Sequence, residues 1–142
     1  MPDDAAAFLL KANEGVLATE AAFEAGWYTV CARSAYFAAF HAAIAALLHA
    51  GIHDRRREWD HAYVQAAFAE QLINRRKMYP AHVRAMLKDN HSVRLAADYQ
   101  PAPISRRQAS EALKRCQELC SLVSQRLQRD DQGVEDAKGE KG

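Results

Sequence analysis

The sequence predicts an all-α protein, an up-and-down bundle of four to five helices. Its 142 residues are enough for a single domain with a sizeable core. Alanine, leucine, glutamate, arginine and glutamine dominate the composition, and β-branched residues are few. Apolar residues recur every three or four positions through most of the chain, in long segments that short links separate.

The first two helices are expected over about residues 3–25 and 28–50, with Gly26 as the stop between them. The second contains the most apolar stretch of the chain, ARSAYFAAFHAAIAALLHA at 32–50. A helix that is apolar nearly all round must be buried on most of its sides. We therefore predict that it lies at the centre of the bundle. Its apolar run of about 14 residues is typical of a core helix rather than a membrane span.

The next two helices are more polar. The third is expected over about residues 55–77, with Asp54 as a candidate N-cap. The fourth covers about residues 81–98. Pro101 and Pro103 end it and force an extended link, because proline lacks the backbone donor that a helix needs.

The fifth helix has the clearest signals. Ser105 and Gln108 have the spacing of a capping box, and apolar residues then repeat at helical spacing to Leu127. After this the composition turns to aspartate, glycine, lysine and glutamate, with almost nothing to bury. We predict a single helical domain over residues 1–129 and a disordered charged tail over 130–142.

Charge and cysteine content limit the setting of the protein. The net charge is +1, but residues 55–94 hold nine Lys or Arg against four acidic residues. This basic bias is compatible with a phosphate-bearing partner, and equally with the solvated faces of surface helices. The three cysteines have no disulfide spacing, and no secretion signal precedes the first helix. We expect a cytoplasmic protein with no membrane contact.

Three segments together resemble a known family. The sequence RSAYFAAFHAA at 33–43 resembles the second-helix signature of the prokaryotic branch of the HEPN family (higher eukaryotes and prokaryotes nucleotide-binding domain). The Asp-His pair at 60–61, followed by Phe68, resembles the third helix of that branch. The sequence RLAADY at 94–99 resembles its Arg-x-x-Ala-Asp-Tyr motif. The resemblance covers about residues 5–128.

The resemblance implies a four- or five-helix bundle that commonly dimerises. Many family members are metal-independent ribonucleases, often toxins paired with an antitoxin of the MNT nucleotidyltransferase type, whereas others bind nucleotide or RNA without catalysis. The ribonucleases carry an arginine, then four to six intervening residues and then a histidine, so the histidine stands five to seven positions after the arginine. This chain has Arg94 at the matching place, but Tyr99 stands where the histidine is expected.

Arg94 and Tyr99 are therefore the candidate catalytic residues. Arginine can grip phosphate oxygens with two parallel hydrogen bonds and keeps its charge. A tyrosine is a poor base near neutral pH, although it can donate a hydrogen bond to phosphate. Asp98 can pair with Arg94 one helical turn away, either to orient it or simply as a structural salt bridge. His41 and Tyr36 are supporting candidates, although on so buried a helix such residues more often belong to the core.

The sequence also contains an alternative pair and a set of histidines that invites a metal site. Arg84 and His91 have the family spacing, but lie earlier in the chain than the matching motif. His49, His53 and His61 do not form a zinc-binding pattern, because Gly51 breaks the helix between the first two and no further ligand is well placed. We expect no metal and no cofactor.

Three functions follow from these residues. The first is an RNA-directed module of HEPN type, a toxin-like ribonuclease that acts as a homodimer. The second is a non-catalytic module that binds nucleotide or RNA and partners a nucleotidyltransferase-type antitoxin. The absent histidine favours this second function and leaves enzymatic activity open. The third is a helical dimer with a scaffolding role.

Overall fold

A computed structural model describes residues 3–53 and 58–140. These residues form helices and no strand, so the predicted all-α bundle is confirmed. The α-helices are α1 (Asp4–Glu24), α2 (Tyr28–His49), α3 (His61–Ala67), α4 (Met86–Tyr99) and α5 (Arg106–Glu140). A π-helix, η1 (Phe68–Arg75), continues α3, and a 3₁₀ turn, η2 (Ala81–Val83), precedes α4.

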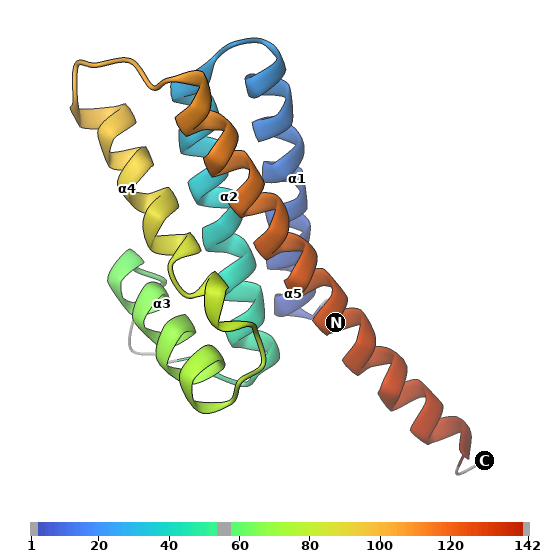
Figure 1. Ribbon diagram of the computed structural model, residues 1–142. Helices are drawn as coiled ribbons and strands as arrows, with labels where there is room; N and C mark the ends of the chain where they lie inside the picture. The colour runs from blue at the N-terminus through green and yellow to red at the C-terminus, as the bar shows by residue number, and fades with distance from the viewer. Residues whose placement is uncertain (1–2, 54–57, 141–142) are drawn as a thin grey trace.

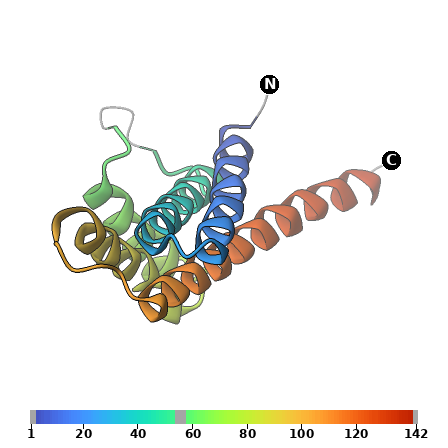
Figure 2. The same ribbon diagram turned by 90° about the horizontal axis from the view of Figure 1, so that it is seen from above.

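The helix α2 forms the centre of the bundle. In Figure 1 it runs behind α5, between α1 and α4, and the view from above in Figure 2 also places it among the other helices. It is the one helix of the described part that is long and apolar enough to cross a membrane, and 72% of its most apolar window is buried by the rest of the bundle. Such burial is the pattern of a core helix.

The contact between α1 and α2 depends on small residues. A Cβ atom added at Gly15 would lie 3.0 Å from the Cβ of Ala38 and 3.2 Å from its Cα. These distances are shorter than ordinary van der Waals contact, so the two backbones can approach this closely only because Gly15 has no side chain.

The third predicted helix begins later and ends differently. Its N-cap is Asp60, whose Oδ1 accepts a hydrogen bond from the backbone N–H of Tyr63 (2.7 Å). Asp54, the candidate cap, lies outside the described residues. After Ala67 the helix widens into η1, which no local pattern predicts. The segment ends at Lys77, the one non-glycine of the described chain with a positive φ (52°).

The fourth predicted helix is also divided. Pro80 adopts an extended conformation, the 3₁₀ turn η2 follows, and α4 proper begins at Met86. It ends at Tyr99, because Gln100 is extended (ψ 142°) ahead of Pro101, as the residue before a proline usually is. The predicted end of this helix at about residue 98 therefore lies within one residue of the observed end.

The helix α5 begins with the predicted capping box. The backbone N–H of Gln108 donates to Ser105 Oγ (3.1 Å), and the backbone N–H of Ser105 donates to Gln108 Oε1 (2.9 Å). The helix then continues to Glu140, so it does not end near Arg129, where the sequence predicts the start of a disordered tail. No proline interrupts these residues, and Figures 1 and 2 show the end of α5 projecting away from the other helices.

Candidate functional site

A shared carboxylate joins α2 to α4. Asp98 forms ion pairs with Arg33 of α2 and with Arg94, one turn earlier on α4 (Nε to Oδ2, 2.9 Å). The side chains of Asp98 and Arg94 are only 13% and 20% exposed, whereas that of Arg33 is 52% exposed. A carboxylate between two guanidinium groups fixes both of them, while the half-exposed Arg33 remains open to solvent.

Asp98 does not occupy all the donors of Arg94. The Nε atom of Arg94 is buried, and its N–H is not aligned on an acceptor within the described part of the chain. The Cζ atom lies 5.3 Å from the ring centroid of Phe37, so the guanidinium packs against an aromatic face. The contact with Asp98 is therefore an ion pair through Nε that positions Arg94, and no hydrogen bond to another residue of the described chain occupies the two terminal nitrogens.

Two histidines and a tyrosine lie next to this arginine. The ring of Tyr36 stacks on that of His91, with centroids 4.8 Å apart, and the rings of His61 and His91 are 5.2 Å apart. The hydroxyl of Tyr36 is 2.5 Å from Nδ1 of His61. The Gln65 side-chain amide lies 2.9 Å from Nδ1 of His91. Each imidazole is thus held through Nδ1, and Nε2 is the nitrogen left for another partner.

The protonation states follow from burial and from neighbouring charges. Burial raises the pKa of Tyr36 to about 12, so its hydroxyl keeps its proton at neutral pH. Burial lowers the pKa of His91, and the positive charges of His61 and Arg94 lower it further. His91 is therefore neutral near pH 7, the state that a general base requires.

The structure brings together four of the residues that the sequence singles out. Arg94, Asp98 and Tyr36 from the main set lie in one cluster, and His91 from the alternative pair joins them. We call Arg33, Tyr36, His61, Gln65, His91, Arg94 and Asp98 the Arg94 cluster.

The other three candidates lie elsewhere. Tyr99 is 75% exposed at the end of α4, outside the cluster. Arg84 lines a pocket formed by residues 73–84, to which His91 does not contribute. His41 lines a groove between α1 and α2 with a volume of about 490 Å³, where burial and the charge of Lys11 lower its pKa. The roles predicted for these residues stay predictions.

Three members of the Arg94 cluster are absent from the site residues that the sequence predicts. Arg33 and His61 stand in segments that carry the family resemblance, so that resemblance is an available signal for them. Gln65 lies one helical turn after His61 on α3, and no sequence pattern distinguishes it from a surface glutamine. Arg33 also lines the groove beside His41, so the cluster and the groove adjoin.

The described residues contain no group of three or more His, Cys, Asp or Glu side chains arranged to hold a metal ion. The two histidines of the Arg94 cluster face a tyrosine and an amide rather than a third ligand. What the arrangement offers chemically is a fixed guanidinium for an anion beside two imidazoles that can carry protons.

Comparison with known families gives one match. The family model described as HEPN domain matches residues 5–127, which include the whole Arg94 cluster. No curated protein matches the chain.

Proposed function

Since the chain belongs to the HEPN domain family, we propose that it is an RNA-directed module that cleaves RNA without a metal ion at the Arg94 cluster. The observation that carries this proposal is the contact between His61 and His91, beside the guanidinium of Arg94. The motif histidine expected after Arg94 is absent, but two imidazoles reach the same neighbourhood from α3 and α4.

The cleavage step needs a base, an acid and a positive charge at the phosphate. His91 Nε2 takes the proton of a ribose 2′-hydroxyl, and the 2′-oxygen then forms a bond to phosphorus. The bond from phosphorus to the 5′-oxygen breaks. His61, in its cationic form, gives that oxygen a proton from Nε2. The products are a 2′,3′-cyclic phosphate and a free 5′-hydroxyl.

The neighbours of the two rings suit these roles. An amide can present either its oxygen or its nitrogen, so Gln65 can accept from Nδ1–H of His91 while Nε2 takes the proton. The hydroxyl of Tyr36 can accept a hydrogen bond from Nδ1–H of His61, both while the ring is cationic and after Nε2 has given up its proton. Arg94, held by Asp98, neutralises the charge that develops on the phosphate oxygens.

The test is cleavage of a fluorescent RNA by purified wild-type protein in the presence of EDTA. We expect Arg94→Ala and His91→Ala each to lower kcat by about 100-fold or more. A matched control is Arg107→Ala, which removes an arginine on α5 that is 88% exposed and pairs with Glu111 rather than with a member of the Arg94 cluster. The cyclic phosphate end, detected by mass spectrometry, identifies the mechanism. Cleavage that needs a metal ion, or that survives both variants, contradicts the proposal.

A Tyr99→Phe variant separates the two possible sets of catalytic residues. Tyr99 is largely exposed and outside the Arg94 cluster, so we expect its cleavage rate to remain within about twofold of wild type. A loss as large as that of Arg94→Ala would restore Tyr99 to the catalytic set.

The second candidate function is that of a toxin-like partner of a nucleotidyltransferase-type antitoxin, and the exposure of Tyr99 favours it. The Tyr99 phenol, exposed at the end of α4, can attack the α-phosphate of a nucleoside triphosphate in the partner enzyme, which forms an O–P bond, releases pyrophosphate and passes the phenol proton to a base of that enzyme. Mass spectrometry of Tyr99 after co-expression with such an enzyme tests this. An unmodified Tyr99, with no complex on size exclusion, contradicts it.

The proposal also includes a homodimer in the cytoplasm. Large apolar side chains are exposed on α1 and α2, namely Leu10, Leu17, Val30 and Phe37. Such exposure is typical of a surface that a second molecule covers. Light scattering at micromolar concentration tests this part, and a monomer at all concentrations contradicts it.

A further inference from the structure

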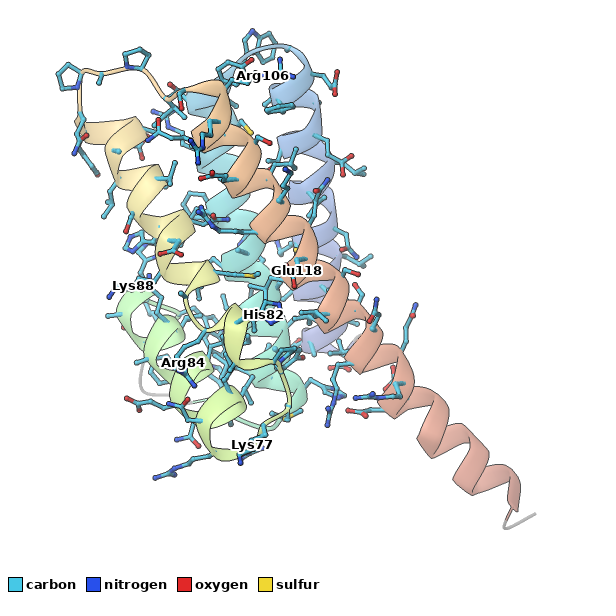
Figure 3. All side chains as sticks on the ribbon, viewed as in Figure 1. Lys77, His82, Arg84, Lys88, Arg106 and Glu118 are labelled. Carbon is cyan, nitrogen blue, oxygen red and sulfur yellow. The ribbon has the colours of Figure 1, made fainter. Side chains whose placement is uncertain are left out.

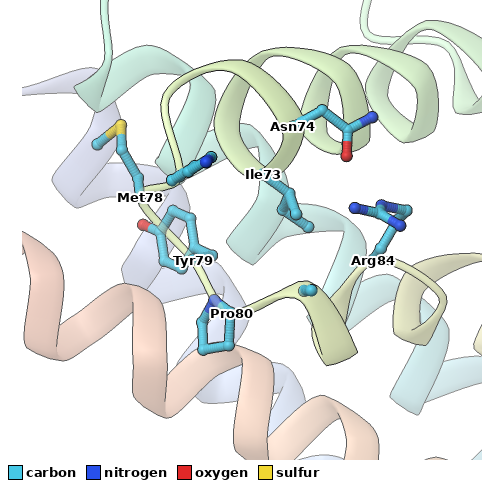
Figure 4. Close-up of a pocket in the computed structure, with 8 residues that line it drawn as sticks. Ile73, Asn74, Met78, Tyr79, Pro80 and Arg84 are labelled. Atoms are coloured by element: carbon cyan, nitrogen blue, oxygen red, sulfur yellow. The ribbon is translucent and has the colours of Figure 1, made fainter.

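A second pocket lies away from the Arg94 cluster, where the chain passes from η1 to η2. Its volume is about 610 Å³, within the range of small-ligand sites. Figure 4 shows Arg84 and Asn74 on one side of Ile73, with Met78, Tyr79 and Pro80 on the other side. The pocket therefore combines an apolar floor with polar side chains at its rim. Its lining residues are Ile73, Asn74, Lys77, Met78, Tyr79, Pro80, Ala81 and Arg84.

The polar part of this rim is positively charged. Lys77 and Arg84 are both exposed, and neither forms an ion pair or a side-chain hydrogen bond with another residue that the structure describes. Residues 74–94 contain six Lys or Arg and a single acidic residue, Asp89. A concave site whose lining contains two unpaired cations attracts anions, and the Asn74 amide can add a hydrogen bond.

The backbone at Lys77 is also unusual. Its φ of 52° lies in the left-handed region, which is unfavourable for a residue with a side chain. Lys77 lies between η1 and the extended Pro80, so this conformation turns the chain around the pocket. A glycine would adopt the turn without strain, yet a cationic side chain stands there.

The helix α4 connects this pocket to the Arg94 cluster. Arg84 precedes α4 by two residues, and Lys88, His91 and Arg94 then follow one face of the helix at intervals of three. Figure 3 shows Lys77, Arg84 and Lys88 along the side of the molecule where η1 meets the start of α4. Lys88 and Arg94 are about 9 Å apart along the helix axis, and the pocket lies beyond Lys88. A single phosphate group therefore cannot contact both Arg94 and the pocket.

We propose that this pocket is a second phosphate-binding subsite, in which Lys77 and Arg84 hold a phosphate of the RNA strand that Arg94 grips at the scissile bond. The inference rests on the proposed function for the identity of its ligand. The phosphate itself, carried by an RNA strand or by a free nucleotide, is the shared chemistry that the lining recognises. The exposed Lys88 lies between the two subsites and borders the path of the strand.

The test compares two double variants that remove the same charge. The pocket variant, Lys77→Gln with Arg84→Gln, removes both cationic side chains that line the pocket. The α5 variant, Arg107→Gln with Lys114→Gln, removes two exposed cationic side chains of α5. Binding of a fluorescent ten-nucleotide RNA with 2′-O-methyl groups, which cannot be cleaved, is measured by anisotropy between 50 and 200 mM salt. Melting temperatures verify that all variants are folded.

We expect the pocket variant to bind about tenfold more weakly and the α5 variant to bind like wild type. The slope of log K against log salt should become shallower by about 0.7 for each phosphate that the pocket variant no longer neutralises. With cleavable RNA, KM should rise about tenfold while kcat stays unchanged. Equal weakening in both double variants, or wild-type binding by the pocket variant, overturns the proposal.

The failure of the pocket and the failure of the proposed function give different results. If wild type cleaves RNA and Arg94→Ala does not, but the pocket variant binds normally, only the pocket proposal fails. If wild type neither binds nor cleaves RNA, the probe becomes adenosine 5′-monophosphate, followed by amide shifts in NMR spectra. Shifts at residues 74–84 that the pocket variant lacks support a free-nucleotide phosphate site, and their absence overturns it.

Discussion

The two faces of α2 differ in what they require of the sequence. Towards α1 the helix presents small residues, and Ala38 meets Gly15 at the limit of van der Waals contact. Towards α3 and α4 it presents Arg33, Tyr36 and Phe37, which make polar and aromatic contacts. The first face controls how closely helices approach, whereas the second controls where charges and protons lie. One helix thus supports the bundle and supplies part of the site.

This difference predicts that substitutions on the packing face act on stability and those on the site face act on activity. The largest effect on stability is expected at the packing face. Gly15→Val places side-chain atoms against the backbone of Ala38, so we expect the free energy of unfolding to fall by about 2 kcal/mol. Urea denaturation measures this change.

The control for the packing face is Ala6→Val, an exposed position on the same helix, where only helix propensity changes by about 0.5 kcal/mol. Equal effects of the two variants on stability would mean that the contact with Ala38 is not tight. The folded fraction of Gly15→Val should still cleave RNA at the wild-type rate.

The next effect concerns the carboxylate that joins the two helices. Asp98→Asn keeps the size of the side chain but removes the charge that pairs with Arg33 and Arg94. We expect about a tenfold drop in kcat/KM, because Arg94 is no longer held in position, and a stability decrease of about 1 kcal/mol. Steady-state kinetics measure the change in kcat/KM, and urea denaturation measures the change in stability. A wild-type kcat/KM in Asp98→Asn would show that the ion pair with Arg94 serves only the structure.

A smaller effect is expected from Tyr36→Phe on the site face. The buried ring remains, but Nδ1 of His61 loses its hydrogen-bond partner. We expect a stability decrease of about 1 kcal/mol and an altered pH dependence of kcat. A Phe variant with an unchanged pH profile would exclude Tyr36 from the proton pathway.

The smallest effect is the response of stability to pH. Burial lowers the pKa of both His41 and His91 below the usual histidine value of 6.5. The unfolded chain therefore binds protons at a higher pH than the folded protein. Their contribution to stability is present above pH 6.5 and disappears as the pH falls through the folded pKa values. Unfolding measured from about pH 7.5 to about pH 5 should show this decrease, and His91→Gln should reduce it. A stability that rises as the pH is lowered contradicts the shifts.

The sequence alone is enough for the class of fold and for much of its order. Helical periodicity, Gly26, the Pro101 link and the capping box at Ser105 are local signals, and the helices they predict occur where expected. The composition of residues 32–50 also identifies the central helix, because a helix without a polar face has to be buried. The spacing of Arg94 and Asp98 predicts their pairing, and spacing is likewise a local property.

Only the tertiary structure decided which distant residues meet. Arg33 and Asp98 form an ion pair although they are 65 positions apart in the sequence. Tyr36 and His61 are in contact although they are 25 positions apart. The widening of α3 into η1 and the turn at Lys77 also have no local signal. Periodicity determines which residues share a face of one helix, but not which faces of different helices are brought together. That choice depends on the packing of the whole bundle, and it assembled the Arg94 cluster from three helices.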